Sequence, residues 1–181
     1  AVVTCIAKYY FTELGREVVN DAMEIQGGAA ISRGPRNLFA HSYIATPIAI
    51  TVEGANILTR SLMIFGQGAI RCHPYAYREI EALTNKDVKA FDDVFWKHIG
   101  HVVQNLSRSI LMSLTRGSIS SSPVSGAASG YYKKLSWTSA SFAFLADVAL
   151  GSYGGGLKIK EKISGRFADI LGWMYLITST L

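Results

Sequence analysis

The chain has 181 residues, a formal net charge of +5 at pH 7, and 49% hydrophobic against 17% charged residues. This length suits one full domain or two small ones. The basic residues are scattered rather than gathered along one stripe, which argues against a nucleic-acid-binding protein. The two cysteines, Cys5 and Cys72, lie far apart without metal-ligand spacing, which fits a reducing compartment and excludes a disulfide framework.

Both ends of the sequence fall within helix-like patterns, and the chain does not begin with methionine, so we expect a fragment of a longer protein. Lys8, Glu13 and Arg16 interrupt the start too early for a signal peptide. The richest apolar stretches, 139–150 and 167–178, each carry an aspartate. They fall short of the ~20 apolar residues that a membrane-spanning helix needs.

Apolar residues recur at helical spacing and no segment alternates with a period of two, so the sequence predicts an all-α fold. Glycine commonly follows the last residue of a helix, and Gly27-Gly28 ends the first predicted helix. Asn37 can cap the second helix, whose continuation Pro47 restricts. The stretch 118–130, rich in serine, glycine and alanine, predicts a flexible loop. The expected helices span about 6–25, 37–44, 56–71, 86–114, 131–150 and 160–181.

Histidines are the first candidates for a metal site. His98 and His101 lie three residues apart on the predicted helix 86–114 and could share a metal ion. No third ligand stands at helical spacing from them, so a capped or half-buried histidine pair is the favoured interpretation, and no metal is expected. His41 and His73 are predicted to stand alone.

One carboxylate, Glu53, stands in the otherwise uncharged run 46–59, beside Gly54 and ahead of a helical pattern. Apolar neighbours disfavour the charged form of a carboxylate and raise its pKa toward the range in which a general base works near neutral pH. Glycine lets a substrate approach the backbone closely. These residues by themselves leave two interpretations open, a catalytic base and a plain junction between two helices.

Two motifs stand at a recognisable separation. The first, Asp-Ala-Met-Glu-Ile-Gln-Gly-Gly at 21–28, closes a helix, and the second, Val-Glu-Gly-Ala-Asn at 52–56, opens another. The pair resembles the C-terminal bundle of the acyl-CoA dehydrogenases, flavoenzymes of fatty-acid β-oxidation, which read Asp-Ala-x-Gln-x-x-Gly-Gly and Tyr-Glu-Gly-Thr. The flanking residues 7–9 and 55–60 look most like the long bacterial branch, which carries an additional helical C-terminal region.

The resemblance divides the chain into the end of the catalytic bundle, 1–78, and an incomplete helical extension, 79–181. It implies an FAD-dependent enzyme in which Glu53 is the general base that removes the α-proton of a fatty acyl-CoA, with Gly54 against the thioester. A hydride would leave the β-carbon for FAD and yield trans-2-enoyl-CoA. The fragment alone is expected to be inactive. By the same resemblance, the FAD contacts fall on Gln26, Gly27, Gly28 and Asn56.

The sequence departs from the family pattern at three positions that the resemblance places against the cofactor. The glutamine of the first motif falls on Glu24, which places a negative charge where a neutral amide would face the cofactor. Where the family has a threonine after Glu-Gly, this chain has Ala55. Where the family has a glutamine two residues further on, this chain has Ile57. These departures put individual FAD contacts in doubt and leave the base untouched.

The resemblance also implies an electron-transfer flavoprotein as acceptor and a homo-oligomer, with FAD usually bound across a subunit boundary. A basic edge at Lys158, Lys160 and Lys162 leaves peripheral membrane contact open beside an ordinary exposed helix start. We expect a cytoplasmic protein, with association with the inner membrane as an alternative. The rival to the enzyme is a non-catalytic helical module for assembly or membrane contact, which the high apolar content and the departures favour.

Overall fold

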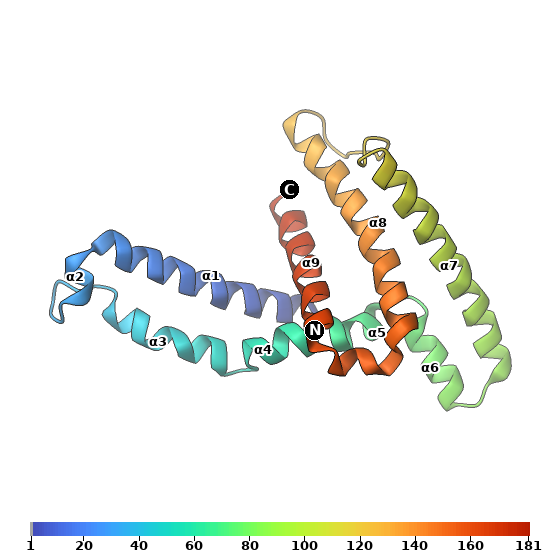
Figure 1. The fold of residues 1–181 in the computed structure, drawn as a ribbon, viewed down its shortest axis with the longest axis horizontal. Coiled ribbons are helices and arrows are strands. Elements are labelled where there is room, and N and C mark those ends of the chain that lie inside the picture. The colour runs from blue at the N-terminus through green and yellow to red at the C-terminus, as the bar shows by residue number, and fades with distance from the viewer. Residues whose placement is uncertain (1) are drawn as a thin grey trace.

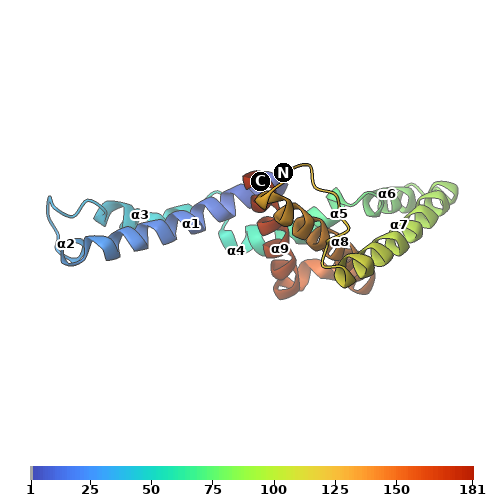
Figure 2. The same ribbon diagram turned by 90° about the horizontal axis from the view of Figure 1, so that it is seen from above.

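The structure is a computed structural model that describes residues 2–181. In chain order its elements are α1 (Val2–Gln26), α2 (Gly28–Ile31), α3 (Ala40–Thr51), α4 (Asn56–Leu58), the π-helical η1 (Thr59–Gln67), α5 (Gly68–Cys72), α6 (Ala76–Thr84), α7 (Val88–Leu114), α8 (Ala127–Tyr153), the 3-10 helix η2 (Gly154–Ile159) and α9 (Glu161–Thr180). No strand occurs in this range, so the predicted all-α class is confirmed. Figures 1 and 2 show an elongated molecule, with the α1–α3 pair at one end and the α6–α7 hairpin at the other.

The α1–α3 pair follows the local signals in the sequence with one exception. Gly27 takes φ +60° directly after α1, as a glycine at a helix end can. Asn37 Oδ1 accepts from the backbone N–H of Ala40 at 2.9 Å and so caps α3. The predicted end near Ile44 is wrong, because α3 continues through Pro47 to Thr51. Proline removes one helical N–H bond, and on this exposed helix water can reach the carbonyl that is left free.

The core lies where α1, η1, α8, η2 and α9 meet. The Phe65 ring stacks on Phe167 with 4.4 Å between centroids and meets Phe142 edge-on at 5.9 Å. Burying a side chain as fully as Phe65 stabilises the fold by about 1.5–3 kcal/mol. The buried core residues are Ile6, Tyr10, Ile64, Phe65, Ala146, Ala149, Leu157 and Ala168. They come from both the beginning and the end of the chain, so the two ends share one core.

Two glycines let α9 approach α1 and η1 closely. A Cβ at Gly172 would overlap the Tyr10 ring, and a Cβ at Gly165 would lie 2.7 Å from the Arg60 guanidinium. Arg60 in turn donates to both carboxylate oxygens of Asp169, from Nε at 2.7 Å and from Nη2 at 2.5 Å. The hydrogen bonds to Asp169 raise the pKa of Arg60 above its ordinary value. A bidentate ion pair therefore joins η1 to α9 next to the core.

The middle of the chain differs from the prediction in its helix boundaries. Residues 76–84 form α6, a helix that the sequence pattern did not indicate. Lys86 then adopts φ +56°, and α7 begins at Val88 with Asp87 as its cap, since Asp87 Oδ1 accepts from the Ala90 N–H at 3.0 Å. The helix α8 starts four residues earlier than expected, which shortens the serine-rich loop.

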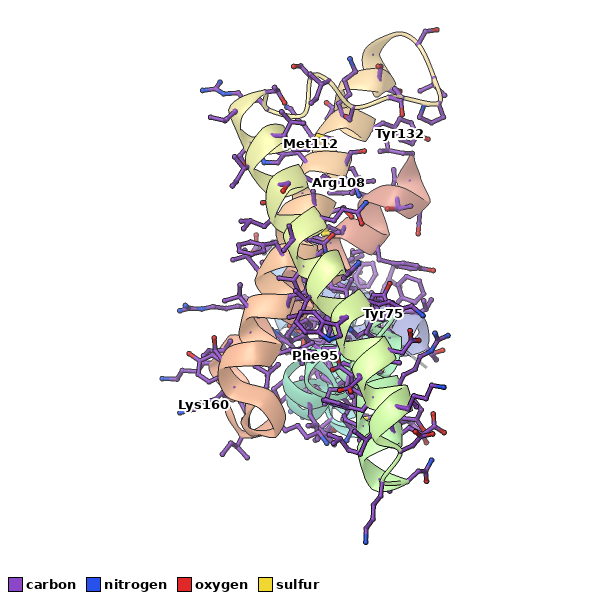
Figure 3. All side chains as sticks on the ribbon, turned by 90° about the vertical axis from the view of Figure 1, so that its right-hand side faces the viewer. Tyr75, Phe95, Arg108, Met112, Tyr132 and Lys160 are labelled. Carbon is purple, nitrogen blue, oxygen red and sulfur yellow. The ribbon has the colours of Figure 1, made fainter. Side chains whose placement is uncertain are left out.

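The outer side of α7 carries apolar side chains that no other element of residues 2–181 covers. Trp96, Val103 and Leu114 are 69, 56 and 80% exposed. Figure 3 looks onto this side, with α7 running in front of α8. Among the described residues no single helix is long and apolar enough to cross a membrane, although α3 and the helical segment 56–72, bent by 44°, would pass that test together.

Candidate functional site

The segment between α3 and α4 makes a tight turn with two consecutive left-handed residues, Glu53 at φ +57° and Gly54 at φ +88°. Glycine adopts this region freely, but a residue with a Cβ there costs on the order of 1–3 kcal/mol. The helix α3 ends just before the turn, where the Val52 N–H still donates to the Ile48 carbonyl at 3.0 Å. A strained glutamate persists only where its surroundings hold the backbone in place.

The contacts that hold this turn come from α1 and from the start of η1. Lys8 Nζ donates to the Gly54 carbonyl at 2.7 Å and to Asn56 Oδ1 at 2.6 Å. Thr59 Oγ1 donates to the same Gly54 carbonyl at 3.2 Å. Hydrogen bonds from a charged group are worth more than neutral ones, about 1.5–3 kcal/mol. The ammonium group of Lys8 therefore fixes the peptide between Gly54 and Ala55, one residue beyond Glu53.

Asn56 is buried and completes this anchor. Its Nδ2 donates to Thr12 Oγ1 at 2.9 Å and to Glu13 Oε1 at 2.8 Å, while its Oδ1 accepts from Lys8. The amide is thus fully occupied by side chains of α1. The contact with FAD that the resemblance implies for Asn56 stays a prediction, and within this chain the residue locks the turn to α1.

Glu53 itself is exposed in the part of the chain that the structure describes. The sequence predicts dry surroundings from Ile48, Ile50 and Val52. Of these, Ile48 and Val52 are 60 and 47% exposed, and Ile50 is half-buried. The glutamate therefore stands on an open apolar surface of this chain rather than in an enclosed pocket.

The Gln26–Gly28 turn lies at the far end of α1. Gln26 Nε2 donates to the Arg36 carbonyl at 2.6 Å. Its Oε1 is buried and, among residues 2–181, has no hydrogen-bond partner. Buried acceptors are nearly always paired, so this oxygen is an exception within the described chain. A Cβ placed on Gly27 or Gly28 would meet no atom within 4 Å, and both glycines thus face open space.

A hollow of about 380 Å³ adjoins this turn, and Arg33 and Arg36 line it together with Gly28. Asn37 closes the loop behind the hollow, with Nδ2 donating to the Ala30 carbonyl at 2.5 Å. Two guanidinium groups beside an open glycine backbone suit an anion such as a phosphate.

The two turns lie far apart on one chain. Lys8, which holds the Glu53 turn, and Gln26 belong to the same continuous helix α1. At ~1.5 Å per residue they are separated by ~27 Å along its axis. In Figure 1 the Gln26 turn is at the tip of the α1–α3 pair, and the Glu53 turn is near the centre of the molecule. The two predicted motifs thus form separate surfaces rather than one pocket.

Comparison with known families covers almost the whole chain. Residues 70–181 match the family described as acyl-CoA dehydrogenase, C-terminal, bacterial type. Residues 1–64 match the acyl-CoA dehydrogenase C-terminal domain. The chain belongs to the acyl-CoA dehydrogenase family. No solved structure matches it. The resemblance read from the two motifs is confirmed, whereas the division at residue 78 stays a prediction.

Acyl-CoA dehydrogenases are generally FAD-dependent oxidoreductases that act on acyl-CoA and form oligomers. In this acyl-CoA dehydrogenase chain, the surface at Gln26, Gly27 and Gly28 leaves room for a nucleotide, and the assignment of these residues to FAD stays a prediction. The unpaired Gln26 oxygen can accept a hydrogen bond, the glycines leave room, and the neighbouring arginines can meet phosphate. The charge at Glu24 is exposed, so water can solvate it.

The sequence motifs did not reveal the residues that position Glu53. Lys8, Thr12 and Glu13 make the contacts, and only their spacing on one face of α1 hinted at a shared task. Their partner Asn56 was expected to contact FAD. Residues separated by more than 40 positions meet here, which no local pattern indicates.

A second polar cluster in this dehydrogenase chain lies between the α5–α6 loop, α7 and α8. The prediction that His73 stands alone is wrong, because its Nε2 lies 2.7 Å from Asp147 Oδ1. His98 Nε2 lies 3.8 Å from the same oxygen. Burial raises the pKa of Asp147, but hydrogen bonds from His73 and Asn105 outweigh this effect, and its pKa lies below the ordinary value. Asp147 is therefore a buried anion at neutral pH.

Proposed function

We propose that the enzyme containing this chain oxidises fatty acyl-CoA to trans-2-enoyl-CoA in fatty-acid β-oxidation, with Glu53 as the general base. Membership of the acyl-CoA dehydrogenase family supports the reaction class. The observation that carries the residue assignment is the left-handed backbone of Glu53 at φ +57°. Strained non-glycine residues cluster at active sites. Lys86 and Arg116 share this backbone region at helix ends, so the strain supports Glu53 as the base together with its family motif.

The reaction removes hydrogen from two adjacent carbons. The Glu53 carboxylate would accept the α-proton, and the electrons of that C–H bond would form the new double bond as a hydride leaves the β-carbon. When bound, FAD would supply the acceptor for that hydride. Lys8 and Thr59 occupy the Gly54 carbonyl and keep the peptide beside Glu53 in one orientation, which favours a fixed position of the base.

Because the apolar surface around Glu53 is open, we infer that substrate or another part of the enzyme covers it in the intact protein. An α-proton is weakly acidic, so the base works best when water is excluded. Exposed Ile48 and Val52 would become buried when an acyl chain or another part of the enzyme lies over them. The dry surroundings of the base would then form only in the assembled, substrate-bound enzyme.

The separation between the two turns supports an oligomer in which FAD is bound across a subunit boundary. With ~27 Å between them, the Gln26 turn and the Glu53 turn of one chain would serve different active sites. Gln26, Gly27 and Gly28 would hold the nucleotide portion of FAD. Electron-transfer flavoprotein as acceptor, and a cytoplasmic location with inner-membrane contact as an alternative, remain expectations from the family resemblance.

The test uses the intact enzyme, because both matched families describe C-terminal domains. Glu53→Gln keeps the shape of the side chain and removes the base. We expect the variant to retain FAD while acyl-CoA reduces it ~10²- to 10⁴-fold more slowly in anaerobic stopped-flow measurements. Glu17→Gln, on the exposed side of α1, is the matched control and should behave as wild type.

Two other outcomes would redirect the assignment. Unchanged flavin reduction in Glu53→Gln would place the base elsewhere. An intact protein that carries no flavin and does not respond to acyl-CoA would instead favour the non-catalytic helical module.

A further inference from the structure

The cluster around Asp147 resembles a metal site at first sight. One ligand atom from each of His73, His98 and Asp147 lies within 4.8 Å of the others. Two imidazoles and a carboxylate are also a donor set that zinc accepts. The positions of the protons decide whether these atoms are free to bind an ion.

The backbone at the start of α6 determines the tautomer of His73. Its Nδ1 accepts from the N–H of Tyr75 at 3.2 Å and from the N–H of Ala76 at 3.0 Å. A ring nitrogen that accepts hydrogen bonds carries no proton, so the neutral ring has its proton on Nε2. That proton points to Asp147 Oδ1, 2.7 Å away. A metal at Nε2 would need the proton on Nδ1 instead, facing two N–H donors.

The carboxylate of Asp147 is satisfied by donors from two different elements. His73, in the loop before α6, donates to Oδ1. Asn105, on α7, donates from Nδ2 to Oδ2 at 3.1 Å and also to His101 Nε2 at 3.0 Å. Each carboxylate oxygen thus has an N–H donor, which stabilises the buried anion without a metal ion bound to it.

His98 is engaged with α6 rather than with Asp147. Its Nδ1 lies 2.7 Å from Glu79 Oε1, and its ring stacks on Tyr75 with 5.7 Å between centroids. Tyr75 is labelled beside α7 in Figure 3. The contact between Glu79 and His98 joins α6 to α7 within the hairpin, whereas Asp147 joins the hairpin to α8.

The contact between the hairpin and α8 leaves open space next to Asp147. Asp147 lines two hollows, one of about 310 Å³ that also includes Phe142, and one of about 640 Å³ that also includes Phe95 and Ile99. Incompletely filled space contributes less contact energy, so the hydrogen bonds carry a larger share of the attachment.

We propose that Asp147 is a hydrogen-bonded clamp, independent of metal, that docks the α6–α7 hairpin onto α8. His73 contributes twice, because the same ring caps α6 and donates to the clamp. Asn105 supplies the second attachment, two turns beyond His98 on α7. The clamp is a conformational device of the C-terminal region and does not depend on the reaction catalysed elsewhere.

The test exchanges donor and acceptor between two positions in the intact enzyme. Asp147→Asn turns one acceptor into a donor that faces another N–H, and Asn105→Asp places a second carboxylate against the first. The double variant N105D/D147N contains the same two residue types as wild type at exchanged positions. It again places one carboxylate opposite one amide N–H donor, and the amide carbonyl at position 147 can accept the hydrogen bond from His73. It is thus the composition-matched control for both single variants.

The readout is backbone amide hydrogen exchange followed peptide by peptide. In each single variant we expect α6 and the first half of α7 to exchange ~10-fold or more faster, while η1 and α9 keep their protection. The double variant should recover most of the lost protection. Unchanged exchange in Asp147→Asn would overturn the clamp, and so would a double variant no better protected than either single one.

A metal titration gives the second test. After treatment with a chelator, we expect Co²⁺ to produce no ligand-field absorption bands and Zn²⁺ to leave the exchange of α6 and α7 unchanged. Stoichiometric Zn²⁺ binding that His98→Ala abolishes would overturn the proposal and assign the cluster to a metal ion.

Discussion

Lys8 reaches across 46 residues of sequence to donate its ammonium protons to the carbonyl of Gly54, 2.7 Å away. The peptide held in this way joins Gly54 to Ala55, one residue beyond Glu53, the candidate base. A residue on a regular helix thereby positions a residue in a strained turn. Rigid helices place functional groups more reproducibly than loops do, which explains why the anchor lies on α1.

Replacement of Lys8 by methionine should slow catalysis without removing FAD. Methionine keeps much of the apolar stem and loses the charged hydrogen bonds to Gly54 and Asn56. A loss of about 1.5–3 kcal/mol corresponds to ~10- to 150-fold slower flavin reduction by acyl-CoA. Lys89→Met, on the exposed surface of α7, is the control. A rate within twofold of wild type would show that the turn needs no anchor from α1.

Replacement of Glu53 by glycine should raise stability while it abolishes activity. Glycine adopts φ +57° without the steric cost that glutamate bears, which favours the folded state by about 1 kcal/mol after its greater chain entropy is counted. Chemical denaturation of the intact enzyme measures this gain. Glu53→Gln is the control, because glutamine has the same steric cost as glutamate at this φ angle. Equal midpoints for the two variants would contradict a strained turn.

Replacement of Gly172 by alanine should destabilise the protein by about 1–3 kcal/mol, because the new methyl group would overlap the Tyr10 ring. Gly151→Ala on α8 meets no atom within 4 Å and should instead stabilise by about 0.5–1 kcal/mol. Denaturant unfolding of both variants tests the prediction. Equal effects of the two would mean that α9 does not approach α1 as closely as described.

Acid should weaken the protein partly through Asp147. Its pKa in the folded state is lowered from 3.8, so the unfolded chain binds the proton more readily. The stabilisation is therefore fully present above pH 3.8 and is lost as pH falls through the lower folded-state pKa. His73 and His101 act on the same carboxylate, and His98, which is paired with Glu79, lies 3.8 Å from it.

The measurement is consequently a difference between two proteins. The free energy of unfolding of wild type minus that of Asp147→Asn should shrink as pH falls below 3.8. A difference that does not change with pH would mean that the carboxylate is not preferentially ionised in the folded protein.

Signals close together in the sequence predicted much of the architecture. Gly27 marks the end of α1, Asn37 caps α3, and the absence of period-two segments indicates a helical fold. The Glu53-Gly54 pair identified the candidate base through its family motif. These features depend on a residue and its immediate neighbours, so they can be predicted without knowledge of the tertiary structure.

Local rules also explain two of the errors. Proline usually ends a helix, but α3 passes through Pro47 because its surface position leaves the freed carbonyl open to water. The helix α6 was missed although its apolar and polar residues fall on opposite sides, because it is short and its start is capped by a histidine ring rather than by a residue typical of caps.

Only the tertiary structure decided which distant residues meet. Lys8 and Gly54 are 46 positions apart, and His73 and Asp147 are 74 positions apart. Helical periodicity tells which side of a helix is apolar, but not which other helix will cover it or in what register. The sequence by itself therefore determined the helical class, most of the helices, the family and the candidate base. The packing of α1 against the Glu53 turn decided what holds that base, and the packing of the α6–α7 hairpin against α8 decided which side chains surround the buried carboxylate, because both depend on contacts between separate helices.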